Sequence, residues 1–508
     1  MAKFSYKNEI IDNYVSEITS RIVLETGIPS DKYHLGKIIL QRIKDDPDFV
    51  MQIDGGTGES ETNKSMLRRS IQCATSFKNM GLRTGDVIVL MAPNHLDQAV
   101  PFYAALYLGI AIAPIDRTLV VDTLDISKPK IIFCQSEKVQ DVQKAVEFLS
   151  LDSKIISFDG SPYTMSFSEM MEEHGGQVEV ENFKPADFNS EETIAFLIST
   201  SGTTGMPKCA ALSHKNMAIS GPYTCSFATK VPFTRSSLLL PPLRWLTAIV
   251  QYVMSVYLKY TRIQSSLPLT TEHILELIRK YKPTLATLSP PMMTTLMKAV
   301  KQENCDLSCL EVLYLGGSAV RSTTTTNIYF LLLYQDLPKI TCKKSLVAIR
   351  PPFVTPYVGY YNKPEATAEV LTKDGWFKTG DMFYRDEDWN FYFVERIKLL
   401  FKYKSQKVSP LEIEGVIRQH PGVLDVAVTS LYHVECGDLP VACVVPVPGS
   451  DVTAEEIKDL VKEKLTDSKQ LRGGVFFLKE LPLTTSTKVH RRKLKQFVME
   501  MTTRQNGM

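Results

Sequence analysis

The sequence predicts a two-domain α/β protein, with a large N-terminal domain of layered α/β sheets and a small α+β C-terminal domain. The chain has 508 residues, which favours more than one domain. Apolar strand-like runs alternate with amphipathic helix-like runs, as in mainly parallel sheets covered by helices. A basic cluster follows residue 396, and a compact α+β pattern follows the cluster. We therefore expect domains over residues 1–397 and 398–508.

Strands and helices alternate along the N-terminal part. Short, nearly continuous apolar runs predict buried strands at residues 86–93, 129–134, 284–290 and 310–317. Residues 96–109 and 138–150 follow two of these runs and have helical spacing. This order of elements is typical of α/β layers.

The C-terminal part contains two capped helices and two strands. Ser409 is a helix N-cap, and Pro410 stands at the first helical position. Thr453 is placed to cap a charged amphipathic helix. Residues 423–431 and 440–447 are β-rich. These elements predict a small, separate α+β unit.

Composition excludes several functional classes. The formal net charge is +2, so no whole-chain argument favours nucleic acid as a partner. The nine cysteines lack CxxC pairs and indicate reduced intracellular thiols. The apolar runs 99–115 and 245–258 are interrupted or too short for a membrane span, so we expect no transmembrane segment. The C-terminal RQNGM is not a peroxisomal SKL-type signal, so the cytoplasm is the default expectation.

Residues 199–214 (STSGTTGMPKCAALSH) follow an apolar run and contain a candidate phosphate-binding loop. The loop is not a Walker A motif, because two residues separate its second glycine from Lys208. Its glycines allow backbone N–H groups to turn toward an anion, and its hydroxyls and lysine add donors and charge. The hydroxyl and glycine residues are Ser201, Gly202, Thr203, Thr204 and Gly205. A polar turn between a strand and a helix is the alternative, and we favour phosphate binding.

Further motifs identify a family resemblance. Together with the loop, residues 358–367 (VGYYNKPEAT), 374–381 (DGWFKTGD), 394–414 and 481–495 occur in an order that resembles the adenylate-forming superfamily. This superfamily contains acyl-CoA synthetases, 4-coumarate–CoA ligases and beetle luciferases. The chain is most similar to insect luciferase-like and 4-coumarate–CoA-ligase-like members, and the resemblance covers almost the whole chain.

The resemblance implies a two-step reaction and its cofactors. A small carboxylic acid attacks the α-phosphate of Mg²⁺-bound ATP and gives acyl-AMP, and the thiol of coenzyme A then displaces AMP. The small C-terminal domain is mobile and rotates between the two steps. The chemistry needs fixed donors and cations around the phosphates and careful positioning of the reactants.

The resemblance also assigns roles to individual residues. Thr200 and the loop up to Gly205, with Lys208, would surround the β- and γ-phosphates. Asp381 would bind the ribose hydroxyls with help from Arg396. By the same resemblance, Lys398 lies at the hinge between the domains and Lys402 acts in the thioester-forming step. Lys404 and Ser405 would contact coenzyme A, and Lys488 would act in adenylation. Taken singly, Asp381 could be a turn residue and each lysine part of a solvated face.

The chain also departs from the family pattern. The family has an aromatic-Gly-x-Thr-Glu motif that contacts adenine, the α-phosphate and Mg²⁺, and no such motif lies between Gly317 and Arg350. The metal ligands therefore stay unassigned. Either the chain is a paralogue that has lost part of the site, or the sequence lacks an internal segment. Four further departures are Arg244, Glu395, Ser405 and Thr487, the last two replacing glycine.

These observations predict an ATP-dependent acid–thiol ligase of the acyl-CoA synthetase type. A catalytically silent nucleotide- or acyl-binding paralogue is the alternative, and a luciferin monooxygenase-like activity ranks below both. The identity of the acid, the oligomeric state and a peroxisomal location that the family allows stay open.

Overall fold

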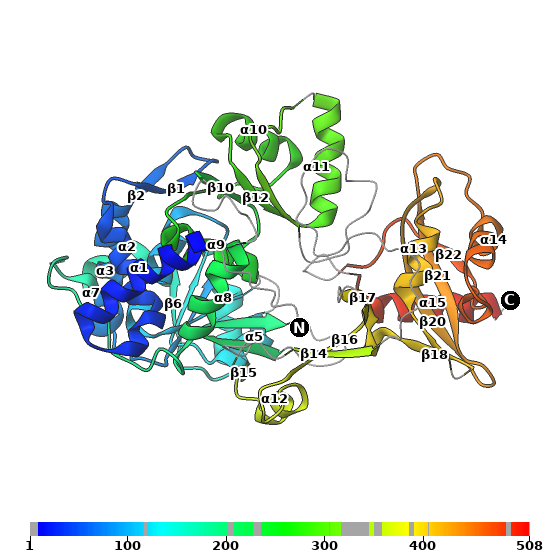
Figure 1. The fold of residues 1–508 in the computed structure, drawn as a ribbon, viewed down its shortest axis with the longest axis horizontal. Helices are drawn as coiled ribbons and strands as arrows, with labels where there is room; N and C mark the ends of the chain where they lie inside the picture. Colours follow the sequence, from blue (N-terminus) through cyan, green and yellow to red (C-terminus); the bar gives the residue numbers. More distant parts are fainter. Residues whose placement is uncertain are drawn as a thin grey trace. The chain divides into compact units, whose positions relative to one another are not determined.

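The computed structural model describes residues 9–115, 120–177, 179–200, 208–226, 235–303, 305–315, 345–349, 358–385, 391–404, 406–483 and 489–506. They fall into two compact units (Figure 1). The first lies within Met1–Leu333 and Arg350–Trp376, and the second within Tyr334–Ile349 and Phe377–Met508. The predicted α/β class, with a large and a smaller domain, is confirmed. The boundary after residue 397 stays a prediction, and residues 377–396 group with the second unit.

An eight-stranded sheet forms one layer of the first unit, in the order β15-β9-β8-β4-β3-β5-β6-β7. Its strands are β3 (Val87–Met91), β4 (Ala111–Pro114), β5 (Ile131–Cys134), β6 (Lys154–Ser157), β7 (Met165–Ser166), β8 (Ile194–Thr200), β9 (Lys208–Ser213) and β15 (Gly359–Tyr360). The sheet is parallel from β8 to β7, whereas β9 is antiparallel to both β8 and β15. The predicted strands at 86–93 and 129–134 are confirmed.

Helices cover both faces of this sheet because its strands are apolar on both sides. The helices are α3 (Asn63–Asn79), α4 (Ala99–Leu108), α5 (Val120–Ser127), α6 (Val139–Phe148) and α7 (Phe167–Gly175). Ile132 of β5 packs with Val142 of α6, whereas the next residue, Phe133, contacts Phe77 of α3 at a ring-centroid distance of 6.1 Å. Successive side chains of a strand point to opposite faces, so one strand contributes to two apolar layers.

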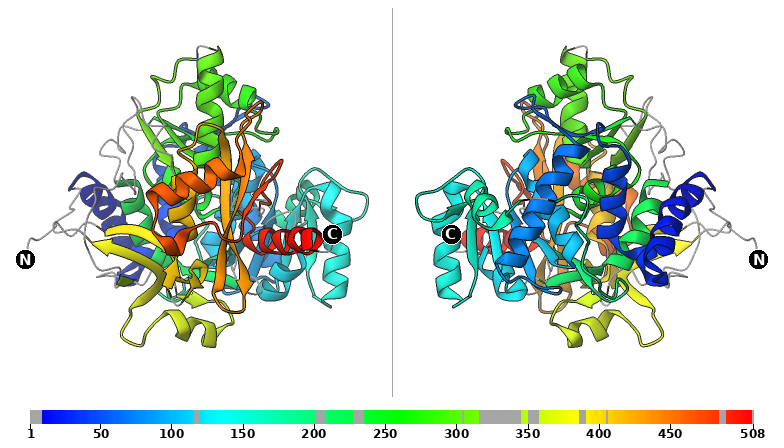
Figure 2. Two further views of the ribbon diagram at one scale, coloured as in Figure 1. Left: turned by 90° about the vertical axis from the view of Figure 1, so that its right-hand side faces the viewer. Right: turned by 90° about the vertical axis from the view of Figure 1, so that its left-hand side faces the viewer.

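A six-stranded sheet forms a second layer, in the order β13-β12-β10-β11-β1-β2. Its strands are β1 (Val50–Asp54), β2 (Ser60–Thr62), β10 (Ser236–Leu239), β11 (Thr261–Gln264), β12 (Leu285–Leu288) and β13 (Val312–Leu315). Helices α10 (Thr271–Tyr281) and α11 (Pro290–Glu303) pack on it through apolar side chains such as Leu275 and Leu296 (Figure 1 and Figure 2). The predicted strands at 284–290 and 310–317 are confirmed.

The remaining helices of this unit are α1 (Glu9–Thr26), α2 (Leu35–Asp45), α8 (His214–Ser226), α9 (Leu246–Tyr257) and α12 (Pro364–Val370), with 3-10 turns η1 (Pro29–Tyr33), η2 (Leu96–Gln98) and η3 (Ser136–Lys138). The two long apolar runs of the sequence contain the buried helices α4 and α9. Between these helices lies the fully buried guanidinium of Arg262. It donates to the Tyr103 hydroxyl at 2.7 Å and the Gln52 amide oxygen at 2.6 Å.

The second unit contains two antiparallel-rich sheets. Its elements are β14 (Ser345–Ile349), β16 (Phe377–Arg385), β17 (Phe391–Arg396), η6 (Ile397–Leu399), β18 (Phe401–Tyr403), β19 (Gln406–Val408), α13 (Pro410–Ile417), β20 (Val423–His433), β21 (Gly437–Pro446), α14 (Ala454–Lys464), η7 (Asp467–Lys469), β22 (Val475–Phe477) and α15 (Arg491–Asn506). One sheet has the order β14-β16-β17, and the other has β19-β18-β21-β20 with β22 beside β21.

Alternation along β20 places helices on both faces of the larger sheet. Val426 and Val428 pack with α13 and α14, whereas Ala427 between them packs with α15 (Figure 1 and Figure 2). The predicted caps are confirmed: the Ser409 hydroxyl accepts from the Glu412 N–H, and Thr453 forms a capping box.

Candidate active site

The frame of the predicted phosphate loop is the antiparallel pair β8–β9. Thr200 ends β8 and Lys208 begins β9, and the two residues are register partners. The Thr200 hydroxyl donates to the carbonyl of Lys208 at 2.9 Å. The two ends of the loop are therefore held together by backbone and side-chain bonds. The predicted residues Ser201, Gly202, Thr203, Thr204 and Gly205 lie outside the described residues.

The Lys208 ammonium lies over an aromatic ring. Its Nζ is 5.0 Å from the ring centroid of Tyr360, which comes from the neighbouring strand β15. Among the residues that the structure describes, no carboxylate forms an ion pair with this lysine. A cation–π contact leaves the hydrogens of the ammonium available to an anion, because a ring offers no lone pairs.

Asp381 and Arg396 form the second group of site residues. They are cross-strand partners on β16 and β17, and Arg396 Nε lies 2.9 Å from Asp381 Oδ1. The side chain of Asp381 is 18% exposed and that of Arg396 is 57% exposed. Burial raises the pKa of the Asp381 carboxyl, and the nearby guanidinium opposes this shift. The structure thus brings this predicted pair together.

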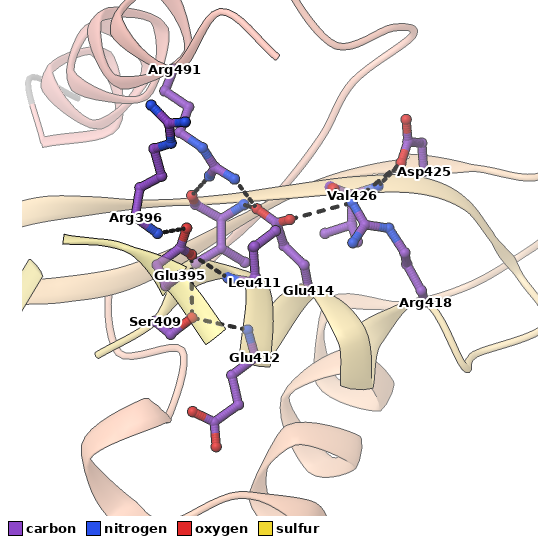
Figure 3. A network of polar contacts seen from close by, with 11 residues as sticks. Glu395, Arg396, Ser409, Leu411, Glu412, Glu414, Arg418, Asp425, Val426 and Arg491 are labelled. Atoms are coloured by element: carbon purple, nitrogen blue, oxygen red, sulfur yellow. Dashed lines mark hydrogen bonds and ion pairs between the residues drawn. The ribbon is translucent and has the colours of Figure 1, made fainter. Parts of the chain in front are cut away.

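Glu395 ties the end of β17 to the start of α13 (Figure 3). Its side chain is fully buried. One carboxylate oxygen accepts from the Arg396 N–H at 2.9 Å, and the other accepts from the Ser409 hydroxyl and the Leu411 N–H, each at 3.2 Å. Burial raises the pKa of Glu395, while these backbone bonds lower it. A carboxylate at a helix N-terminus satisfies free N–H groups and interacts favourably with the helix dipole.

A second buried carboxylate, Glu414, lies beside this group (Figure 3). Arg491 Nη2 contacts it at 3.0 Å and Arg418 Nη2 at 3.3 Å. The Val428 N–H donates to the same side chain at 2.8 Å. Two arginines and a strand N–H therefore compensate the cost of burying this charge and join α13, β20 and α15.

The predicted lysines of the second unit are exposed. Lys398 lies in η6, Lys402 in β18, and Lys404 follows β18. In the described part of the chain, none of the three forms an ion pair. The backbone N–H of Lys404 donates to the carbonyl of Cys436 at 2.8 Å, and its φ of 43° is left-handed. Ser405 and Lys488 lie outside the described residues.

Sequence reasoning missed two features of the site. The Lys208–Tyr360 contact joins two separate motifs, and only the spatial pairing of β9 with β15 reveals it. The helix-capping role of Glu395 was also missed, although the departure at this position was visible in the sequence. Both depend on tertiary contacts.

The profile of the AMP-binding enzyme family matches residues 40–331, and that of the AMP-binding enzyme C-terminal domain matches residues 412–488. The chain belongs to the AMP-binding enzyme family. The predicted resemblance to adenylate-forming enzymes is thereby confirmed.

Two relatives and one solved structure are similar to this AMP-binding protein. Luciferin 4-monooxygenase of Photuris pensylvanica is 29% identical, with 90% of this chain and 93% of the relative covered. 4-Coumarate–CoA ligase 4 of Arabidopsis thaliana is 26% identical, with 87% of each chain covered. The structure of ATP-bound MatB from Rhodopseudomonas palustris superimposes with a TM-score of 0.77 at 20% identity, over 90% of this chain and 98% of MatB.

Two kinds of feature are absent from the described residues. None of their helices combines the length and apolarity that a membrane crossing requires. No group of three or more His, Cys, Asp or Glu side chains among them could hold a metal ion.

Proposed function

We propose that this protein is an ATP-dependent acid–thiol ligase that adenylates a small carboxylic acid and transfers the acyl group to coenzyme A. The observation that carries the proposal is the ion pair between Asp381 and Arg396, the two residues to which the resemblance assigns the ribose hydroxyls. A carboxylate accepts hydrogen bonds from hydroxyls, and the guanidinium beside it limits the cost of keeping it ionised. The antiparallel pairing of β8 and β9, with Thr200 opposite Lys208, supports the same proposal.

Each unit offers residues that suit one part of a nucleotide. Lys208 would meet the terminal phosphates, since no described carboxylate neutralises it, and Asp381 would accept the ribose hydroxyls. When bound, ATP supplies the adenylyl group that activates the acid. Lys488 and Lys402 are the proposed catalytic lysines of the two steps, and Lys398 the proposed hinge residue.

The described residues offer candidate contacts for coenzyme A but no assigned ligand for Mg²⁺. The exposed ammonium groups of Lys402 and Lys404 suit the phosphates of coenzyme A, and Ser405 completes the proposed contact. The described residues offer no cluster for a metal ion, so Mg²⁺ has no assigned ligand among them.

ATP–pyrophosphate exchange with a panel of fatty and aromatic acids tests the proposal. We expect exchange with at least one acid, and loss of exchange in Lys488→Ala. Asp381→Asn should weaken nucleotide binding, because an amide both donates and accepts and does not match two hydroxyl donors as a carboxylate does. Asp467→Asn is the matched control, since Asp467 is an ion-paired aspartate of the same unit with a 79% exposed side chain. Folded protein without exchange for any acid refutes the proposal.

A catalytically silent nucleotide- or acyl-binding protein is the second candidate. The observation that favours it is the missing aromatic-Gly-x-Thr-Glu motif between Gly317 and Arg350, a segment mostly outside the described residues. ATP binding without exchange would support this candidate, and turnover that Lys488→Ala abolishes would exclude it. Light emission, which ranks lower, requires the same adenylation followed by reaction with O₂, so photon counting with luciferin can accompany the exchange assay.

A further inference from the structure

Hydrogen bonds from the strands on both sides of β9 hold the backbone around Lys208 in place. Thr200 pairs with it across β8–β9, and the Tyr361 N–H donates to the carbonyl of Cys209, the next residue, at 2.8 Å. The start of β9 is thus an interior position of the sheet. The Cα of Lys208 therefore has little freedom, and the place of its ammonium depends on what its long side chain contacts.

The Tyr360 ring is the contact that the structure shows. The ammonium lies 5.0 Å from the ring centroid, and both side chains are half-buried. A lysine has four rotatable bonds, and ordering them costs conformational entropy. If the ring already holds the ammonium before a ligand binds, less conformational entropy is lost on binding.

Tyr360 is itself held in place. Its N–H donates to the Thr367 hydroxyl of α12 at 2.8 Å. Gly359, which precedes it, has a φ of 151° and lies so close to Thr367 that a Cβ would come within 2.7 Å of the Thr367 methyl carbon. The close packing of α12 on β15 therefore sets where the ring lies.

We propose that Tyr360 is a positioning residue that holds the Lys208 ammonium for the terminal phosphates of a bound nucleoside triphosphate. The inference rests on the proposed function, because it takes Lys208 as a ligand of the terminal phosphates. Tyr360 contacts the ammonium rather than the nucleotide, so its effect is exerted through Lys208. It acts on ligands that carry β- and γ-phosphates and leaves AMP binding unchanged.

Calorimetric titration of the full chain with ATP, pyrophosphate and AMP tests this role. Tyr360→Leu should weaken ATP and pyrophosphate binding about two- to fivefold, as expected for loss of a partly exposed cation–π contact. AMP binding should stay within experimental error. Tyr360→Phe keeps the ring and should bind all three ligands like the wild type. In an active enzyme, Tyr360→Leu should raise KM for ATP more than it lowers kcat.

Tyr33→Leu is the matched control. Tyr33 makes a similar cation–π contact with Lys215, at 5.2 Å, elsewhere in the same unit. Its loss should leave ATP affinity unchanged, even where thermal stability falls as much as in Tyr360→Leu. Equal losses of ATP and AMP affinity in Tyr360→Leu would indicate general damage and overturn the proposal, as would unchanged or tighter ATP binding.

A measurement without nucleotide separates this inference from the proposed function. In protein whose lysines carry ¹³C-methyl groups, the Lys208 signal should shift upfield under the ring current, and the shift should vanish in Tyr360→Leu. Lys208→Arg assigns the signal. Absence of the shift refutes the contact itself. A wild type that shows the shift but binds no triphosphate refutes the proposed function and, with it, the role of the contact in binding.

Discussion

Replacing Glu395 by alanine should destabilise the second unit by about 2–4 kcal/mol. The change leaves the N–H groups of Arg396 and Leu411 without their acceptor, and each unsatisfied buried donor costs about 1–3 kcal/mol. The Ser409 hydroxyl can rotate toward another acceptor, so it adds little. Burial raises the pKa of Glu395, which means that keeping its charge in the folded protein costs free energy. The alanine variant no longer bears this cost, so the expected destabilisation is smaller than the sum of the costs of the two unsatisfied N–H groups.

Hydrogen exchange measured by mass spectrometry on the full chain locates this effect. Peptides from β17 and the first turn of α13 should lose protection, while peptides from the first unit should not change. Glu412→Ala is the matched control, because Glu412 lies on the same helix with a side chain 34% exposed and pairs with Lys469 at the surface. If denaturation curves of Glu395→Ala and Glu412→Ala shift equally, the capping role is wrong.

Three further predictions concern stability. Burial lowers the pKa of His34 to about 4, so the unfolded chain binds a proton below pH 6.5 that the folded chain does not. His34 alone should therefore contribute a loss of stability of about 2 kcal/mol between pH 7.5 and 5, to which His95 and His214 add because burial lowers their pKa values as well. Guanidinium unfolding at both pH values should show a loss smaller by about this amount in His34→Gln than in the wild type. Lys404→Gly should stabilise the folded protein by about 0.5–1 kcal/mol in the same assay, because Lys404 has a left-handed φ of 43° that glycine adopts without strain. A loss of stability in this variant would contradict the prediction. Arg262→Ala should destabilise the fold by about 3–5 kcal/mol, because it leaves a cavity and removes the donor to Gln52. Arg262→Lys should not restore this stability, since an ammonium cannot reach both Tyr103 and Gln52 as the guanidinium fork does. Melting temperatures of the two variants test both expectations.

The elements that the sequence predicted correctly are those with local causes. The caps at Ser409 and Thr453 depend on residues three positions away, and nearly continuous apolar runs mark strands of a sheet that helices cover on both faces. The features that could not be predicted depend on distant partners. The Glu395 carboxylate accepts a hydrogen bond from the Leu411 N–H, and the Tyr360 ring makes a cation–π contact with the Lys208 ammonium. Neither choice of partner follows from spacing, because each is made by the packing of separate strands and helices.

The energetics of the Asp381–Arg396 pair favour a role in ligand binding over a role in stability. The raised pKa of Asp381 means that its ionised form is less favourable in the folded protein than in the unfolded chain. The guanidinium that opposes this shift is 57% exposed, and ion pairs with such exposed partners contribute about 0–1 kcal/mol. An apolar cross-strand pair at this position would stabilise the sheet at least as well. What the aspartate adds is a carboxylate with several acceptor sites, more than its contact with Arg396 Nε uses, so a ligand hydroxyl can donate to it.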